Sequence, residues 1–530
     1  MRAVRERFDI AIVGSGFAGS LLAMIARRLG RSVVLLEKFR HPRFVIGESS
    51  TPLANLLLEE LALRYDLSRL LPLAKWGSWQ STYPEIACGL KRGFTFYHHT
   101  FDQLFAALSD RSDQLLVAAS PHDGIADTHW YRPDFDHFLV REAQRLGVEY
   151  LDEVALDTPF WSGEEICLEG NRLGEPLTIR AGFVVDATGP RGFLHKALKL
   201  SERPFTNLPA TQGLYTHFTG VRRLADVLPV ATGETPPYPI DDAAVHHIFD
   251  GGWIWVLRFN NGLTSAGVAV VDDLARELRL AEGLPAWKRL LQRLPTVARQ
   301  FTGAEPRLPF IHAPRLSFRS EAITGERWAL LPSAAGFIDP LLSTGFPLTL
   351  LGVARLAEAI DRDWGSADFD ARLKSYEALT SNELLAAEQL VGALYSSMND
   401  FPLFTSLSLL YFAAASYTEA ARRLGRPQLA GSFLLNDHPL FGPQSGPCLR
   451  RAMHRHTPTE RQELIELIDR AIEPFDIAGL RNRGRRNWYP VDADDILGAA
   501  GKLGTGQEEI KKLLARSGFL GSGAGTNVRA

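Results

Sequence analysis

Two glycine-rich segments contain the residue types best suited to bind an anionic group through the backbone. The first is Gly14-Ser-Gly16-Phe17-Ala18-Gly19, and the second runs from Gly336 to Gly345 as Gly-Phe-Ile-Asp-Pro-Leu-Leu-Ser-Thr-Gly. Backbone N–H groups in a small-residue turn that opens a helix have no helical partner, and the helix dipole favours negative charge there. Each segment therefore predicts an anion site, provided that a helix follows it.

The elements expected around the first segment are those of a dinucleotide site. Residues 8–13 predict a short apolar strand, 20–29 a helix and 32–36 a second strand, which ends at Glu37. An acidic residue at this distance binds ribose hydroxyls, and its presence in place of an arginine argues against a 2′-phosphate. The pattern predicts a bound dinucleotide without deciding between FAD and NAD.

Later segments return to the same domain. Residues 182–189 form an apolar strand that ends in Asp186 and a small-residue turn, and residues 327–333 lead into the second glycine segment. The fold class expected is α/β, with a discontinuous Rossmann-like domain, an inserted antiparallel sheet and a helical C-terminal region. The ranges are 1–65, 181–195 and 320–365 for the cofactor domain, 66–180 and 196–319 for the substrate domain, 366–515 for the helical region and 516–530 for a flexible tail.

Composition limits the classes of partner. The 530 residues are 45% hydrophobic and 22% charged with a net charge of -3, which gives no reason to expect a nucleic acid or membrane partner. The three cysteines are widely spaced, so neither a disulfide framework nor a thiolate metal site is expected. The first strand begins by Phe8, which leaves no room for a signal peptide, and a cytoplasmic protein is expected.

Two histidine pairs, His98-His99 and His246-His247, lie in expected strands. Neighbours on a strand point to opposite faces, so neither pair predicts a metal site. We expect one solvated and one packed histidine in each pair and no metal in the protein.

Several segments together resemble the FAD-dependent halogenase family over residues 8–360. They are Gly14 to Gly19 with Glu37, Gly47-Glu48-Ser49-Ser50-Thr51-Pro52, Asp186 to Gly189, Trp253-Ile-Trp255 and Gly336 to Gly345. The resemblance implies the flavin monooxygenase fold with bound FAD. It implies as cofactor-binding residues Gly14, Gly16, Phe17, Ala18, Gly19, Glu37, Lys38, Gly47, Glu48, Ser49, Asp339 and Phe346.

The resemblance also implies a reaction. Family members use reduced FAD, O2 and halide, and pass hypohalous acid to a lysine beside an electron-rich aromatic or phenolic substrate, either a small molecule or carrier-bound. It implies that Thr344 and Gly345 bind halide, that Lys91 is catalytic, and that a separate flavin reductase supplies reduced FAD. Lys75 is the second candidate lysine.

The residues themselves leave alternatives open. The N–H groups at Thr344 and Gly345 suit a reduced-flavin anion as well as halide, Asp339 could cap a helix, and Arg132 could face the cofactor or form an Arg–Asp pair. Lys91 could equally be a surface lysine at the start of a strand.

Four positions differ from the family pattern. They are Leu342, where tryptophan-specific halogenases carry glutamate, Leu257-Arg258, where the pattern has Ile-Pro, and Ser333, where an Asp is common. Free tryptophan is therefore disfavoured as a substrate. A hydroxylating monooxygenase or dehydrogenase on the same scaffold is the first alternative, and a flavoprotein that reduces or binds a lipid-like molecule is the second.

Overall fold

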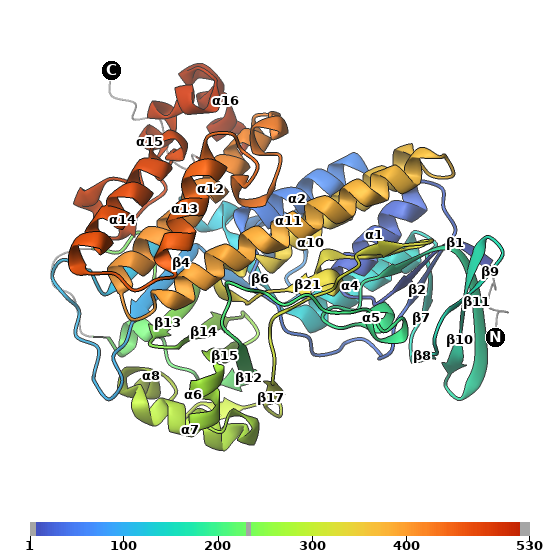
Figure 1. Cartoon of the computed structure of the whole chain (residues 1–530), viewed down its shortest axis with the longest axis horizontal. Coiled ribbons are helices and arrows are strands. Elements are labelled where there is room, and N and C mark those ends of the chain that lie inside the picture. The colour runs from blue at the N-terminus through green and yellow to red at the C-terminus, as the bar shows by residue number, and fades with distance from the viewer. Residues whose placement is uncertain (1–6, 229–234, 520–530) are drawn as a thin grey trace.

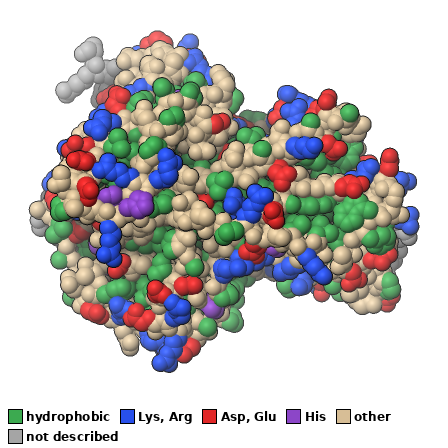
Figure 2. Space-filling view, in the orientation of Figure 1, with side chains coloured by type: hydrophobic (Ala, Val, Ile, Leu, Met, Phe, Trp, Pro, Cys, Tyr) green, Lys and Arg blue, Asp and Glu red, His purple; other side chains and the backbone are tan. Residues whose placement is uncertain are grey.

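The computed structural model describes residues 7–228 and 235–519. Its two large sheets lie side by side, and the C-terminal helices cover the second sheet, while the long helix α11 (Asp368–Ser396) extends over both parts (Figure 1). Lys, Arg, Asp and Glu side chains are mixed over the face seen in Figure 2, without a large patch of one sign. No helix in the described ranges is long and apolar enough to span a bilayer.

The first sheet is the expected dinucleotide-binding sheet. Its main path is β19-β20-β11-β1-β2-β7, and β1 (Arg7–Val13) lies parallel between β2 (Val33–Leu36) and β11 (Glu175–Asp186). The path is completed by β7 (Glu149–Leu151), β19 (Thr324–Gly325) and β20 (Trp328–Leu330). The central strands are near-continuous apolar runs because helices cover both faces of a parallel sheet. Helix α1 (Phe17–Arg28) packs against α4 (Arg132–Arg145) and α10 (Gly345–Arg362).

One predicted boundary is wrong. Residues 149–172, assigned from sequence to the substrate domain, form strands of the first sheet. They are β7, β8 (Val154–Leu156), β9 (Phe160–Ser162) and β10 (Glu165–Arg172). Strand β10 turns directly into β11 through Leu173 and Gly174, whose φ angles of 55° and 89° are those of a two-residue hairpin, and its pairing with β11 places β10 in the first sheet.

The second sheet follows the path β16-β12-β15-β14-β13-β4-β5-β22. The inserted antiparallel sheet expected from the sequence is present, with β13 (Ala244–Phe249), β14 (Gly252–Arg258) and β15 (Thr264–Val271) paired antiparallel in order. The other strands are β4 (Gly93–His98), β5 (Gln114–Ala118), β12 (Thr211–Thr219), β16 (Glu305–Pro306), β17 (Ile311–Ala313) and β22 (Trp488–Tyr489). Because β22 pairs with β5, the C-terminal region is joined to this sheet.

The histidine pairs pack differently from the expectation. His246 and His247 are both buried, and the His247 ring bonds across the sheet to His99 at 2.9 Å, so the expected solvated histidine is wrong for this pair. Both faces of β13 are covered, because His247 bonds Gln300 of α8 (Pro295–Gln300) at 2.9 Å on one face and His246 stacks on Phe96 on the other. Within the described residues no group of three or more His, Cys, Asp or Glu side chains could hold a metal ion.

The region after residue 366 is helical. Its larger helices are α11, α12 (Phe401–Arg423), α13 (Phe441–Ala452), α14 (Pro458–Ile472) and α16 (Gln507–Arg516). Helix α12 contacts α2 (Pro52–Arg64), which follows the Glu48 segment, and so brings C-terminal side chains to the centre of the molecule. Within the expected tail Phe519 packs against the core, and residues 520–530 lie outside the described residues.

Candidate active site

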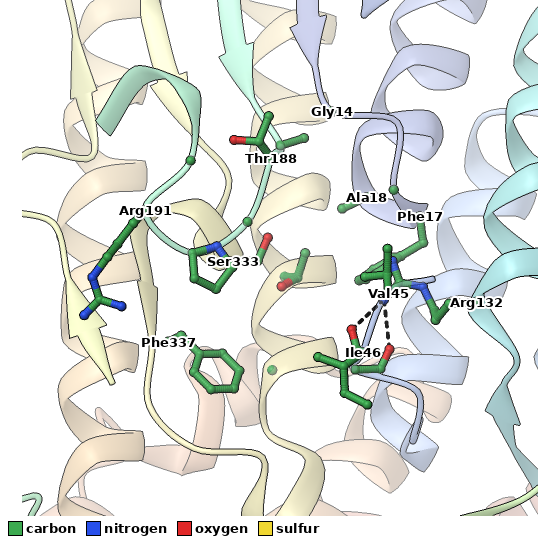
Figure 3. A pocket seen from close by; sticks show the side chains of 18 of the residues that line it. Gly14, Phe17, Ala18, Val45, Ile46, Arg132, Thr188, Arg191, Ser333 and Phe337 are labelled. Atoms are coloured by element: carbon green, nitrogen blue, oxygen red, sulfur yellow. Dashed lines mark hydrogen bonds between the residues drawn. The ribbon is translucent and has the colours of Figure 1, made fainter. Parts of the chain in front are cut away.

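A cavity of about 1500 Å³ extends from the ends of β1 and β2 to the start of α10. Figure 3 shows part of its wall, with Gly14, Phe17, Ala18, Val45, Ile46 and Arg132 on one side and Thr188, Arg191, Ser333 and Phe337 on the other. We call this the first cavity. Its wall joins residues from the N-terminal segment, from the turn after β11 and from the second glycine segment.

The turn between β1 and α1 requires its glycines. Gly14 has φ +102°, and a Cβ there would lie 2.7 Å from the carbonyl carbon of Ala187. A Cβ on Gly19 would lie 2.0 Å from the Gly14 oxygen, so Gly19 allows α1 to pack on the turn and does not line the cavity. No side chain caps the helix at Gly16. The N–H groups at the start of α1 are therefore suited to bind a pyrophosphate.

Glu37 lies where the ribose hydroxyls are expected. Its carboxylate accepts hydrogen bonds from the Ser15 hydroxyl at 2.8 Å and the Phe39 N–H at 3.0 Å, and pairs with Arg43 at 2.9 Å. Burial acts to raise the pKa of Glu37, but Arg43 and the hydrogen bonds outweigh it and lower the pKa. The group is thus an ionised acceptor, and Lys38 lies beside it in the cavity wall.

The Gly47-Glu48-Ser49 segment forms the wall beneath the middle of the first cavity. Arg132 donates to the Gly47 carbonyl at 2.8 Å and pairs with Asp136 through two bonds of 2.8 Å. The Arg–Asp pair expected as one alternative is therefore present, and the same side chain also lines the cavity. Glu48 is buried and its Oε1 lies 2.7 Å from His217 Nε2. Thr51 then caps α2 by accepting from the Ala54 N–H, which fixes where the segment ends.

The second glycine segment forms a strained turn at the other end of the first cavity. Leu342 and Ser343 have φ angles of 62° and 55°, and the Leu342 carbonyl accepts a bond of 3.0 Å from Tyr411. Thr344 and Gly345 follow at the start of α10, and a Cβ on Gly345 would meet nothing within 4 Å. Thr344 and Gly345 therefore line the cavity at a helix start, where the first N–H groups have no partner within the helix.

Asp339 holds this turn against the second sheet. It accepts from the Leu341 N–H at 2.9 Å, from Trp253 Nε1 at 3.2 Å and from the Tyr395 hydroxyl at 2.9 Å. Burial raises the pKa of Asp339 to about 6. Phe346 stacks on Trp130 with ring centroids 4.5 Å apart and closes the cavity beside the turn.

Lys91 is fully buried, not a surface lysine. It ends β3 (Cys88–Lys91), and its Nζ donates to the Ser49 hydroxyl at 2.9 Å and lies 3.9 Å from the Phe94 ring centroid. Burial lowers the pKa of Lys91 to about 7, opposed by the nearby Asp127 carboxylate. Ser49 lines the first cavity, whereas Phe94 and Asp127 line another.

This second cavity has a volume of about 190 Å³ and lies under the C-terminal helices. Its wall is mainly apolar, with Phe94, Pro347, Tyr411, Phe412 and Phe433, and it includes the polar Asn55, Lys75, Asp127, Glu419 and Arg423. The first turn of α10 separates the two cavities, because Gly345 and Phe346 line the first and Pro347 lines the second. Lys91 itself lines neither cavity, but its neighbours do, with Ser49 in the wall of the large cavity and Phe94 and Asp127 in the wall of the small one.

Several residues of the site were not found from sequence. They are Arg43, Asn55, Asp127, His217, Tyr395 and Tyr411. None belongs to a motif with a fixed spacing. Asp127 alone offered a signal, since it is an acid in a strand-like segment before Trp130, but only the pairing of β3 with β6 (Asp127–Trp130) places it beside Lys91.

Comparison with known proteins identifies the family. A family model described as FAD dependent oxidoreductase matches residues 9–336. Monodechloroaminopyrrolnitrin halogenase PrnC of Pseudomonas fluorescens is 30% identical over 412 residues, which cover 77% of this chain and 71% of the relative. The chain belongs to the flavin-dependent halogenases.

Other relatives agree with this assignment. Tetracycline 7-halogenase of Kitasatospora aureofaciens is 28% identical over 77% of this chain and 73% of its own. The crystal structure of halogenase PltM with phloroglucinol and FAD superposes with a TM-score of 0.79 at 25% identity, covering 90% of this chain and 99% of PltM. FAD is thus the cofactor of this halogenase-family enzyme, and the fold class predicted from sequence is confirmed. The comparisons favour halogenation over hydroxylation or dehydrogenation on the same scaffold.

Proposed function

We propose that this halogenase modifies a small electron-rich aromatic or phenolic substrate bound in the second cavity, with Lys91 as the catalytic residue that receives the hypohalous acid. The observation that carries the proposal is the position of Lys91, which is fully buried with its Nζ bonded to Ser49 of the first cavity and 3.9 Å from the centroid of the Phe94 ring of the second. A buried ammonium with a lowered pKa can donate a hydrogen bond to hypohalous acid and can also become a neutral amine near pH 7. A dry wall prevents loss of the oxidant to water.

The cofactor residues of the first cavity support the flavin half of the proposal. The start of α1 is suited to bind the pyrophosphate, and Glu37 is suited to bind the ribose. The turn before α10 lines the other end of the cavity. Bound FAD supplies the oxidation of halide by O2. Thr344 and Gly345 are proposed to bind the halide through their N–H groups, because both residues line the first cavity at the start of a helix.

We further propose that reduced FAD comes from a separate flavin reductase. Among the described residues only Gly14 to Gly19 combines a preceding strand, a Gly-x-Gly-x-x-Gly turn and a following helix, and we assign that turn to FAD. NADH alone should then leave the bound FAD oxidised under anaerobic conditions, and adding a flavin reductase should bleach it. Bleaching by NADH alone contradicts this part of the proposal.

The substrate class is tested with reduced FAD, O2 and either chloride or bromide. The probes are phenol, 1,3-dihydroxybenzene, aniline and pyrrole-2-carboxylate, the last both free and loaded on a carrier protein, since one relative is named as a brominase of a carrier-bound pyrrole. Mass spectrometry should show a halogen isotope pattern on at least one phenolic or amino-aromatic probe. Oxygen incorporated without halogen would establish the hydroxylating alternative, and no oxygen consumption would favour the lipid-binding one.

A further inference from the structure

We propose that Asp127 is the base that accepts the proton leaving the aromatic ring when the new carbon–halogen bond forms. This inference rests on the proposed function, because it takes the hypohalous acid and the aromatic substrate from it. It adds a second catalytic residue on the substrate side of Lys91.

The backbone places the two residues opposite each other. Strands β3 and β6 are antiparallel, and Lys91 is the register partner of Asp127. Lys91 has 0% and Asp127 6% of its surface exposed. The Asn55 side chain on α2 donates to Asp127 Oδ1 at 2.8 Å and so fixes the orientation of the carboxyl group.

One oxygen of Asp127 is left available. Its Oδ2 is buried and has no hydrogen-bond partner among the described residues, and Asp127 belongs to the wall of the second cavity. Asp241, another buried carboxylate, shows the structural alternative, since its two oxygens accept from the Leu224 N–H at 2.7 Å and the Ala225 N–H at 3.0 Å. A buried oxygen without a hydrogen-bond partner lowers the stability of the folded protein. A substrate bound in the second cavity would supply a partner for Asp127 Oδ2.

The charges around Asp127 suit a proton acceptor at neutral pH. Burial raises the pKa of Asp127 to about 7, and Lys91 opposes that rise. Glu419 and Arg423 act from α12 with opposite signs, and Asn55 lowers the pKa further. Tyr411, on the same helix, stays neutral because burial raises its pKa. Lys91 and Asp127 influence each other's pKa across the β3–β6 pair, so a change in the charge of one alters the proton affinity of the other.

The step balances with these two residues. The ring carbon attacks the halogen of hypohalous acid, the halogen–oxygen bond breaks, and the leaving hydroxide takes a proton from the Lys91 ammonium to become water. Asp127 Oδ2 takes the proton from the halogenated carbon, and that C–H electron pair restores the aromatic ring. Transfer of the proton from Asp127 to the neutral Lys91 amine then returns the pair to its starting state.

The test compares Asp127→Asn with the control Asp241→Asn in single turnovers, using phenol and ring-deuterated phenol, or the equivalent pair for whichever probe the wild type halogenates fastest. We expect D127N to halogenate about 100-fold more slowly, in line with general-base catalysis. Because loss of the ring proton then limits the rate, the deuterated probe should react at least about twofold more slowly in D127N and at the same rate in wild type and D241N. A purely structural role would not create this isotope effect.

The pH profile provides a second readout. The wild-type rate should fall as pH decreases below about 7, because Asp127 becomes protonated, and D127N should lack this limb. Asn55→Ala keeps the carboxylate but removes a hydrogen bond that lowers its pKa, so the limb should move to higher pH. If D127N fails to bind FAD, the pH profile of N55A alone tests whether Asp127 is the base.

The outcomes separate the two proposals. If the wild type halogenates no probe, the proposed function fails and the inference falls with it. If the wild type is active and D127N shows neither the rate loss nor the isotope effect, or if the limb in N55A does not move, only the role of Asp127 is overturned.

Discussion

The two cavities on either side of Lys91 are built in different ways. The first is made largely by backbone, with glycine turns and two helix starts that present N–H groups, together with one acid, Glu37. The second is made by side chains from α2, β4, β6, α10 and the C-terminal helices. A cofactor shared by a large family needs a fixed backbone, whereas a substrate site can change by replacing side chains. Variants of the first cavity should therefore lose FAD affinity, whereas variants beside the second should lose halogenation and keep FAD.

The largest difference is expected for Lys91→Met. Methionine keeps the buried volume but cannot donate to hypohalous acid, so halogenation should fall at least about 1000-fold, or about 4 kcal/mol in the activation free energy. FAD affinity, measured by fluorescence, should stay within about threefold because Nζ bonds Ser49 and not the phosphate-binding turn. Lys75→Met alters the lysine that lines the second cavity and should leave most of the rate; a larger loss in K75M than in K91M would make Lys75 the catalytic residue.

The reverse pattern is expected for Gly14→Ala, which changes only the first cavity. A Cβ 2.7 Å from backbone must displace the turn, so FAD affinity should fall about 100-fold, or about 2.7 kcal/mol. Gly30→Ala is the matched control, since Gly30 also has a positive φ, of +81°, but no atom within 4 Å of its Cβ. G30A should cost about 1–2 kcal/mol in unfolding free energy and leave FAD affinity unchanged. Equal FAD loss in both variants would show that backbone strain alone is responsible.

Asp339 links the first cavity to the second sheet, and its effect should appear in the pH dependence of stability. Its pKa is raised from 3.8 to about 6, so the folded state binds more protons than the unfolded state between these values. The stabilisation is complete below pH 3.8 and is lost as pH rises through 6. The apo-protein should lose about 2 kcal/mol from this group between pH 4 and pH 6. In Asp339→Asn, urea unfolding across that range should lack this loss, and identical slopes in both proteins would contradict the assignment.

The smallest effect is expected for Tyr411→Phe, which connects the two cavities. Tyr411 lines the second cavity and donates to the Leu342 carbonyl in the turn of the first. Loss of one hydrogen bond should cost about 1 kcal/mol in unfolding free energy. Halide should also bind less tightly, because Leu342, whose backbone is left-handed, loses the hydrogen bond that holds its carbonyl. The expected result is a raised KM for bromide with unchanged FAD affinity. Tyr417→Phe, on the same helix but bonded to Lys502, is the control.

The sequence predicted the first cavity well and the second poorly. Gly14, Glu37 and the Gly336–Gly345 segment are recognisable because backbone geometry demands particular residues at fixed spacings. Lys91 was found only through resemblance to a family. Asp127 and Asn55 were missed because no local rule connects a residue of α2 with one of β6. The placement of residues 149–172 in the wrong domain has the same cause, since strand pairing depends on the partner and not on the strand alone.

The sequence by itself determined a dinucleotide site and the turn at each end of the first cavity, because turns and helix starts are encoded by adjacent residues, and its resemblance to a family added FAD. Tertiary structure decided which lysine is buried, which carboxylate lies opposite it in the strand register and which helices enclose the second cavity. These properties depend on burial and on contacts between residues far apart in the chain, and burial also sets the pKa values of Lys91 and Asp127.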